Sequence, residues 1–205
     1  MIIKKPFSEL HDYYNAIFIH IPKSAGSSIE MALYNTWGMV THTKALTYQK
    51  ADPKKFNQYY TFTFTRNPYD RFVSAYNYLI KGGRNKFDKS WAKQHLQYKT
   101  FNDFVLSLTN PDIRKIIFSY IHFIPQYQFI SNENNQIIIN KIFQFENLNS
   151  DFLELCRTLN IQVKLSHENQ FIHPHYLSYY NTESKKIIAK LYETDFQLLN
   201  YKPLI

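Results

Sequence analysis

The sequence predicts an α/β fold of three layers, in which helices cover both faces of a central, mainly parallel sheet. Two observations favour this class. Short segments typical of buried strands are followed by segments whose apolar residues recur at helical spacing. Each of the first two strands also ends at a proline-containing turn that leads directly into a helix. Such alternation favours parallel strands, because each helix returns the chain across the sheet.

The first strand, loop and helix lie near the N-terminus. Residues 17–21 form a short apolar run that predicts a buried strand, and Pro22 ends it. Apolar residues then recur at helical spacing, which predicts a helix over residues 27–36. Residues 41–57 are polar and mixed, so a loop with a short helix is expected there.

A second strand and helix follow. Residues 59–65 alternate aromatic residues with threonine, which predicts a strand. Arg66-Asn67-Pro68 breaks it, and a proline suits the first turn of the helix that apolar spacing continues to Leu79. Gly82-Gly83 marks a turn. Residues 82–100 are polar, basic and aromatic, and we interpret them as an excursion or lid.

The rest of the chain continues the alternation. A β-rich segment is expected at residues 136–145, and it is followed by a helix that reaches about residue 159. The other helices are expected over residues 101–108, 113–118 and 184–199. Since no internal repeat or low-complexity linker separates these elements, residues 1–205 are expected to form a single domain.

The composition is that of a folded, basic protein. Hydrophobic residues make up 44% of the 205 residues, enough for a sizeable core. The formal net charge of +8 favours an anionic partner, whether nucleic acid, phosphorylated cofactor, acidic glycan or membrane surface. The single cysteine, Cys156, excludes an intrachain disulfide and lies in an apolar helical pattern, as a core residue would. With no signal-peptide run and no transmembrane stretch, we expect a soluble cytoplasmic protein, and the Asn-, Lys-, Ile- and Tyr-rich composition suggests a bacterial one.

A loop of small residues follows the first strand and reads Pro22-Lys23-Ser24-Ala25-Gly26-Ser27-Ser28. Backbone N–H groups at a helix N-terminus bind phosphate, and small side chains let the phosphate approach closely. Lys23 adds a mobile cation and the serines add hydroxyl donors. The sequence therefore predicts a phosphate-binding loop, and the competing interpretation is an ordinary tight turn between strand and helix.

The loop is not a Walker loop. That motif places its lysine directly after the second glycine, whereas Lys23 precedes Gly26 by three residues. No apolar strand ends in an aspartate that would hold Mg²⁺. Both differences disfavour a nucleotide triphosphatase.

A second anion-binding motif runs from Arg66 to Ser74. Arg66 ends the second strand, at the sheet edge where ligands collect in open α/β folds. Its guanidinium can grip a phosphate with two hydrogen bonds, and the Ser74 hydroxyl can donate to the same anion. The alternative is that Arg66 forms a salt bridge at a turn.

Together, residues 19–28 (IHIPKSAGSS) and 64–76 (FTRNPYDRFVSAY) resemble the carbohydrate sulfotransferase family, which includes heparan and chondroitin sulfate sulfotransferases and bacterial relatives. Weaker parts of the resemblance include His122, Pro125-Gln126 and residues 145–148. The family resemblance implies a P-loop-like fold. Ser24-Ala25 stands where many members have Thr-Gly or Thr-Ala, a change that keeps the size and the hydroxyl.

The resemblance implies that the first segment binds the 5′-phosphosulfate of 3′-phosphoadenosine-5′-phosphosulfate (PAPS), and that Arg66 and Ser74 bind its 3′-phosphate. It implies in-line transfer of the sulfuryl group to an acceptor hydroxyl. Lys23 would stabilise charge on the bridging oxygen, and backbone N–H groups from Ala25 to Ser28 would hold the phosphate. The sulfuryl group carries less charge than a phosphoryl group, so no metal is expected.

A general base must accept the proton of the acceptor hydroxyl, and histidine suits this role near neutral pH. His42 is the first candidate, because its placement resembles that of the base in heparan sulfate 2-O-sulfotransferases. His122 is the second candidate, as a base or as a ligand of sulfate or substrate. His20 is interpreted as a packed core histidine. The sequence His173-Pro174-His175 lacks an acid or cysteine that would complete a metal site.

Other functions stay open. A P-loop kinase or nucleotide hydrolase would fit the loop but not its lysine placement. A basic module that binds RNA or another polyanion would fit the charge, although the basic residues are scattered and no stacking motif is present. We expect a glycan acceptor and no nucleic acid partner; a tyrosine or a small metabolite is the alternative acceptor.

Overall fold

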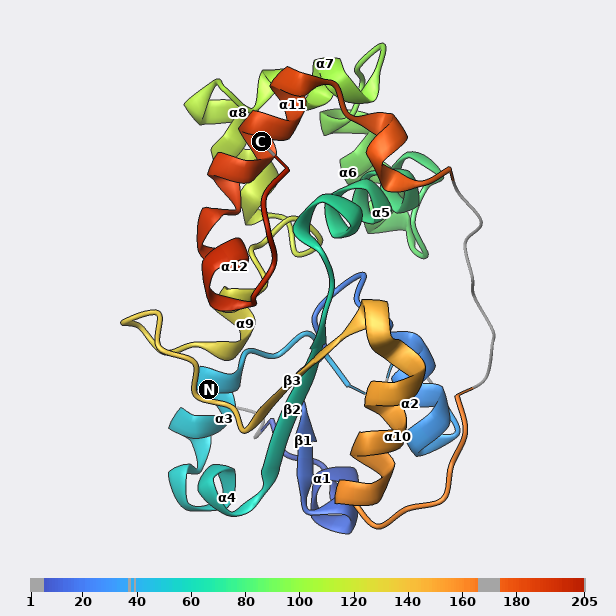
Figure 1. The fold of residues 1–205 in the computed structure, drawn as a ribbon, viewed down its shortest axis with the longest axis vertical. Coiled ribbons are helices and arrows are strands. Elements are labelled where there is room, and N and C mark those ends of the chain that lie inside the picture. The colour runs from blue at the N-terminus through green and yellow to red at the C-terminus, as the bar shows by residue number, and fades with distance from the viewer. Residues whose placement is uncertain (1–5, 37, 39, 166–173, 205) are drawn as a thin grey trace. The chain divides into compact units, whose positions relative to one another are not determined.

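The computed structural model describes residues 6–36, 38, 40–165 and 174–204 (Figure 1). The chain divides into two compact units. The first, which we call the sheet unit, consists of Met1–Arg66 and Gln126–Gln170. The second, the helical unit, consists of Asn67–Pro125 and Phe171–Ile205.

The sheet unit is built on three parallel strands in the order β1-β2-β3. They span Ala16–Phe18, Tyr60–Thr65 and Lys141–Gln144. The predicted strands 17–21 and 136–145 are therefore shorter than expected, whereas the second is close to its predicted range. Beyond β1 the chain still follows the sheet edge, since Ile19 N–H donates to Phe62 O at 2.8 Å. The β-branched and aromatic residues of β2 suit a central strand with two buried faces.

Helices flank this sheet, as the α/β prediction requires (Figure 1). α2 (Gly26–Tyr34) and α10 (Leu148–Thr158) cover one face, where Ile29, Leu33 and Leu155 pack with the strand phenylalanines. Cys156 lies in this core, as predicted. α3 (Ala45–Ala51) and α4 (Pro53–Gln58) lie on the opposite side. The short helices α1, α9 and η1 span Glu9–Tyr14, Tyr127–Ile130 and Phe145–Asn147.

The other unit packs its helices around an aromatic core. α5 (Pro68–Ile80) begins as predicted, with proline in its first turn and the Asn67 side chain accepting from Tyr69 N–H at 3.0 Å. Its buried face includes Phe72 and Tyr76, and both rings stack on Phe104. The remaining helices are α6 (Lys86–His95), α7 (Phe101–Ser107), α8 (Pro111–Ser119), η2 (Tyr176–Tyr179), α11 (Thr182–Leu191) and α12 (Glu193–Leu198).

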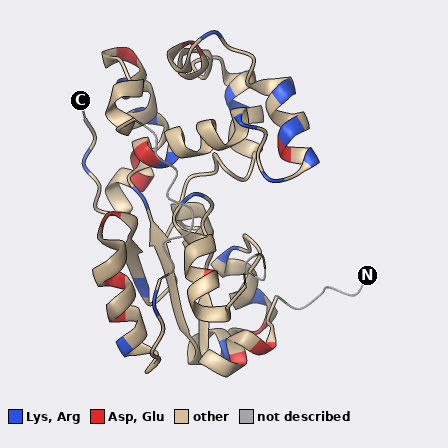
Figure 2. Ribbon diagram, turned by 90° about the vertical axis from the view of Figure 1, so that its right-hand side faces the viewer, with Lys and Arg blue, Asp and Glu red and all other residues tan. Residues whose placement is uncertain are grey.

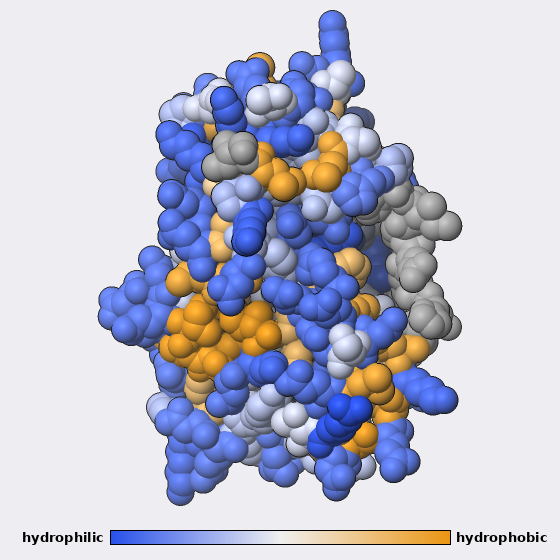
Figure 3. Space-filling model, in the orientation of Figure 1, coloured by the Kyte–Doolittle hydropathy of each residue, from blue (hydrophilic) through white to orange (hydrophobic). Residues whose placement is uncertain are grey.

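Two predicted segments differ in detail. Residues 41–57 hold two short helices instead of one, because Asp52 caps α4 through its side chain and Pro53 starts it. The expected last helix over 184–199 is broken at Tyr192, which ends α11 and precedes α12. The face drawn in Figure 3 is mostly hydrophilic with separate hydrophobic patches, as amphipathic helices produce. Among the described residues, each helix is too short or too polar to cross a bilayer.

Candidate active site

The small-residue loop connects β1 with α2 and holds two residues in left-handed backbone conformation. Lys23 has a φ of 69° and Ala25, which caps α2, has a φ of 65°. Such conformations are unfavourable for residues with a Cβ atom, so the surrounding structure must hold them. α2 begins at Gly26, and its partial positive charge therefore lies at the loop. A loop of this geometry can bind an anion, and its role as a phosphate site stays a prediction.

Gly26 is required by a close approach. A Cβ atom at this position would lie 1.8 Å from Nε2 of His20, well inside van der Waals contact. The His20 ring therefore rests on the first turn of α2. A side chain at position 26 would displace that ring or the loop.

Arg66 of the second motif lies beside the loop. Its Nη1 donates to Lys23 O at 3.3 Å, and its guanidinium carbon lies 4.1 Å from the centroid of the Phe145 ring. Arg66 is buried, with 9% of its surface exposed. A guanidinium that lies over an aromatic face can still donate hydrogen bonds from its edge, within its own plane. The structure thus brings the loop and the arginine of the two motifs together within the sheet unit.

Gln126 fixes this arrangement and was missed as a site residue. Its Oε1 accepts from Arg66 N–H at 2.9 Å, and its Nε2 donates to Arg66 O at 2.8 Å. Ser24 Oγ donates to the same Oε1 at 3.4 Å. Gln126 and Ser24 are buried. The weaker Pro125-Gln126 part of the resemblance was the sequence signal that could have found it.

His42, the first candidate base, lies against His20. Its Nδ1 is 2.9 Å from the carbonyl oxygen of His20, and the two ring centroids are 4.4 Å apart at an interplanar angle of 71°. A carbonyl oxygen can only accept, so His42 Nδ1 carries a hydrogen. The neutral ring then has its lone pair on Nε2.

A buried carboxylate completes this cluster. His20 Nδ1 lies 2.7 Å from Oε1 of Glu30, and the other oxygen of Glu30 accepts from Gly38 N–H. Glu30 is fully buried on α2. His20 is therefore packed, as predicted, but it also contacts the candidate base and the loop. Spacing in the sequence did not predict this cluster, because His20, Glu30 and His42 come from a strand extension, a helix and a loop.

Ser74 and His122 belong to the helical unit. Ser74 lies half-buried on α5, and its pairing with Arg66 on one anion stays a prediction. His122 is buried, with Nε2 3.7 Å from Oδ1 of Asp88. Asp88 also accepts from the hydroxyls of Tyr78, at 2.6 Å, and Tyr120.

The pKa values of Asp88 and of its two tyrosine partners shift in opposite directions. Burial acts to raise the pKa of Asp88, but His122 and the two tyrosine hydroxyls outweigh burial and hold that pKa well below its usual value. Burial and the bond to Asp88 in turn raise the pKa of Tyr78 to about 12. The cluster therefore holds a carboxylate and protonated tyrosines at neutral pH. Asp88 anchors α6, in the segment interpreted as a lid or acceptor-binding excursion.

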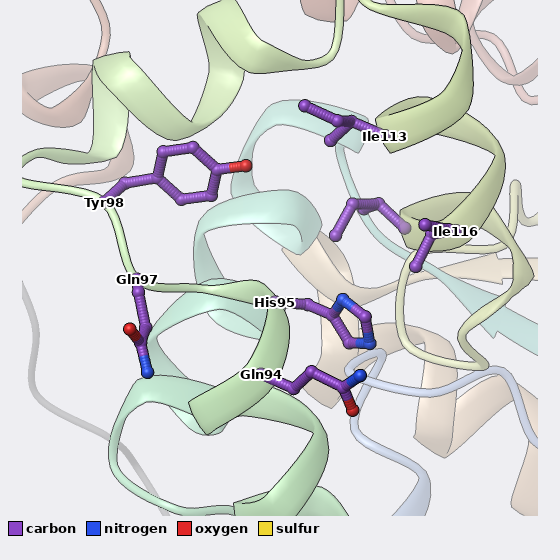
Figure 4. Close-up of a pocket in the computed structure, with 7 residues that line it drawn as sticks. Gln94, His95, Gln97, Tyr98, Ile113 and Ile116 are labelled. Carbon is purple, nitrogen blue, oxygen red and sulfur yellow. The ribbon is translucent and has the colours of Figure 1, made fainter.

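A surface hollow of about 260 Å³ lies between the end of α6 and α8 (Figure 4). It combines amide, phenol and imidazole groups with an isoleucine wall. The lining residues are Gln94, His95, Gln97, Tyr98, Ile113, Ile116 and Ile117. Within the described ranges, no three His, Cys, Asp or Glu side chains gather as a metal site. His173 lies outside those ranges, so the His173-Pro174-His175 sequence is not described as a whole.

Comparison with known proteins points to one family. The sequence model of one protein family, the sulfotransferase family, matches residues 10–202 of the chain. Among solved structures, the chain is similar to the crystal structure of a sulfotransferase from Alicyclobacillus acidocaldarius, with a TM-score of 0.33 and 13% sequence identity. That alignment covers 97% of this chain and 93% of the other. The comparison with curated proteins gives no match.

Proposed function

The chain belongs to the sulfotransferase family, and on this premise we propose that it transfers the sulfuryl group of PAPS to a hydroxyl of a glycan acceptor. The observation that carries the proposal is the contact between Arg66 and the Lys23 carbonyl. It joins the two anion-binding motifs at the N-terminus of α2. A donor with a 5′-phosphosulfate and a 3′-phosphate needs two such groups side by side.

Each loop residue has a separate role in the proposal. Backbone N–H groups from Ala25 to Ser27, with the hydroxyls of Ser27 and Ser28, hold the 5′-phosphosulfate at the helix N-terminus. Ser28 N–H instead donates to Ala25 O at 2.9 Å, and the Ser24 hydroxyl supports the loop through its bond to Gln126. Lys23 stabilises charge that develops on the bridging oxygen as the sulfur–oxygen bond breaks. Arg66 and Ser74 bind the 3′-phosphate. The left-handed backbone at Lys23 and Ala25 supports this, because it shapes the loop before the donor binds.

His42 accepts the proton of the acceptor hydroxyl through Nε2. The hydrogen bond from Nδ1 to the His20 carbonyl supports this role, since it leaves the lone pair on Nε2. The acceptor oxygen forms a bond to sulfur while the bond from sulfur to the phosphate oxygen breaks. His122 is the second candidate, and its proximity to Asp88 would likewise orient its ring.

The acceptor is proposed to bind along residues 82–100. This segment and its flanks carry six exposed basic side chains: Lys81, Arg84, Lys86, Lys89, Lys93 and Lys99. Figure 2 marks lysine and arginine positions in blue along the ribbon. Its acidic residue, Asp88, is buried in the tyrosine cluster, so the exposed charge is positive. The nearby hollow offers amide and aromatic groups that suit sugar hydroxyls and sugar rings (Figure 4). An acidic or neutral glycan chain fits these groups.

The proposal is tested by a screen of glycan, tyrosine and small-metabolite acceptors with sulfur-labelled PAPS. We expect label in a glycan. Calorimetry with adenosine 3′,5′-bisphosphate tests the donor site: Lys23→Ala and Arg66→Ala should each weaken binding at least tenfold, whereas Lys54→Ala, an exposed lysine on α4, should not.

Three results would contradict the proposal. Unchanged bisphosphate binding in both site variants would move the donor site elsewhere. Metal-dependent turnover of nucleoside triphosphates would indicate a kinase or hydrolase. Steeply salt-dependent binding of nucleic acid, without affinity for the bisphosphate, would indicate a polyanion-binding module.

A further inference from the structure

The candidate base is held by a chain of contacts that leads back to a buried carboxylate. The backbone of His20 accepts from His42 Nδ1 at 2.9 Å, and the His20 side chain contacts Glu30 at 2.7 Å. The rings of His42 and His20 also form a T-shaped contact. One residue thus touches the base through both its main chain and its side chain.

The orientation of the His20 ring is determined on three sides. Glu30 Oε1 accepts from Nδ1, the first turn of α2 lies against Nε2, and Phe18 stacks on the ring with centroids 5.5 Å apart. Glu30 is itself fixed, since it is fully buried and its second oxygen accepts from Gly38 N–H. A buried carboxylate needs such partners to remain charged.

We propose that His20 and Glu30 are positioning residues, which hold His42 beside the phosphate-binding loop with Nε2 as its proton-accepting nitrogen. This inference rests on the proposed function, because it assigns His42 as the base. Because the His20 ring rests on Gly26, the same chain of contacts sets the distance between base and loop. In-line transfer depends on that distance, and a displacement of about 1 Å can lower the rate about 100-fold.

A double-mutant cycle tests the proposal. Glu30→Gln keeps the size of the side chain and one acceptor oxygen, but it removes the charge that holds both partners. We expect this substitution to lower kcat about tenfold or more in the wild-type background, with unchanged affinity for adenosine 3′,5′-bisphosphate. In a His42→Ala background it should lower kcat less than twofold, because the residue on which it acts is gone. The same loss in both backgrounds would overturn the proposal.

A second measurement does not depend on activity. In protein with ¹⁵N-labelled histidine, the ring nitrogens of His42 report which nitrogen carries the hydrogen. We expect Nδ1–H in the wild type and a mixture of tautomers in Glu30→Gln or His20→Ala. Glu133→Gln, which removes an exposed acid paired with Lys50, is the matched control and should change nothing.

The two measurements separate the possible failures. If the wild type moves no label from PAPS but His42 shows the expected tautomer and its dependence on Glu30, the proposed function fails and the positioning contact stands. If the wild-type His42 carries its hydrogen on Nε2, or if Glu30→Gln leaves its spectrum unchanged, the positioning role is wrong whatever the activity.

Discussion

The side-chain amide of Gln126 is bonded at both ends to the backbone of Arg66, with Oε1 accepting from Arg66 N–H at 2.9 Å and Nε2 donating to Arg66 O at 2.8 Å. This pairing replaces the ladder bonds that Arg66 would make if β2 continued. It leaves the guanidinium of the same residue to lie over Phe145 beside the loop. Arg66 is the candidate residue for binding phosphate, and its position therefore depends on Gln126, which lies 60 positions away in sequence.

Gln126→Ala should lower the free energy of unfolding by about 2 kcal/mol, because two buried backbone groups lose their partner. Urea denaturation measures this loss. Gln128→Ala is the control and should cost less than half as much, because Gln128 is half-buried on α9, the short helix that Gln126 precedes. An equal loss in both variants would mean that the amide of Gln126 has no special role.

Phe145→Ala should weaken binding of adenosine 3′,5′-bisphosphate about three- to tenfold, since the Arg66 guanidinium loses the ring on which it stacks. Phe145→Tyr keeps an aromatic face and should bind as the wild type does. Calorimetry distinguishes the two. If both variants bind equally well, Arg66 does not need the ring for its orientation.

Gly26→Ala should abolish most sulfuryl transfer and destabilise the fold, because the new methyl group would overlap the His20 ring. Combining it with His20→Ala should restore part of the lost stability, since the space for the methyl group then opens. Thermal denaturation of the two single variants and the double variant measures the coupling. Strictly additive losses would contradict the contact.

Asp88→Asn should destabilise the protein most at neutral pH. The pKa of Asp88 is lower in the folded chain than its ordinary value of 3.8, so the charged form stabilises the fold above about pH 4 and loses this effect as the pH falls. The difference in unfolding free energy from the wild type should therefore shrink between pH 7 and pH 3. Asp112→Asn, an exposed acid on α8, is the comparison, and a constant difference for Asp88→Asn would contradict the assignment.

The parallel α/β core could be predicted from the sequence, because Pro22 and Pro68 mark the points where a strand ends and a helix follows. It also indicated the loop and Arg66, whose residue types and spacing reflect local chemistry. Tertiary partners left no such local trace. Gln126, Glu30 and the Asp88 cluster meet their partners only after folding, and each looks like an ordinary polar residue in its own segment.

Strand ends were the least predictable feature of the fold. Ile137, Ile138 and Ile139 have high β-propensity, yet β3 begins at Lys141. Asn140 explains part of the difference: its side-chain oxygen accepts from Thr61 N–H at 2.8 Å, in place of a ladder bond. A side chain that substitutes for backbone pairing cannot be recognised from apolar patterning alone.

The order of the three strands also has a consequence for biosynthesis. β2 pairs with β1 early in the chain, but its other edge waits for β3, which follows only after the 75 residues between Thr65 and Lys141. During translation, the central strand therefore emerges with one side unpaired until most of the chain has been made. An unpaired edge of alternating phenylalanine and threonine is a template for association with other chains. Nascent chains that stall between these two strands should therefore be the most prone to aggregate and the most dependent on chaperones.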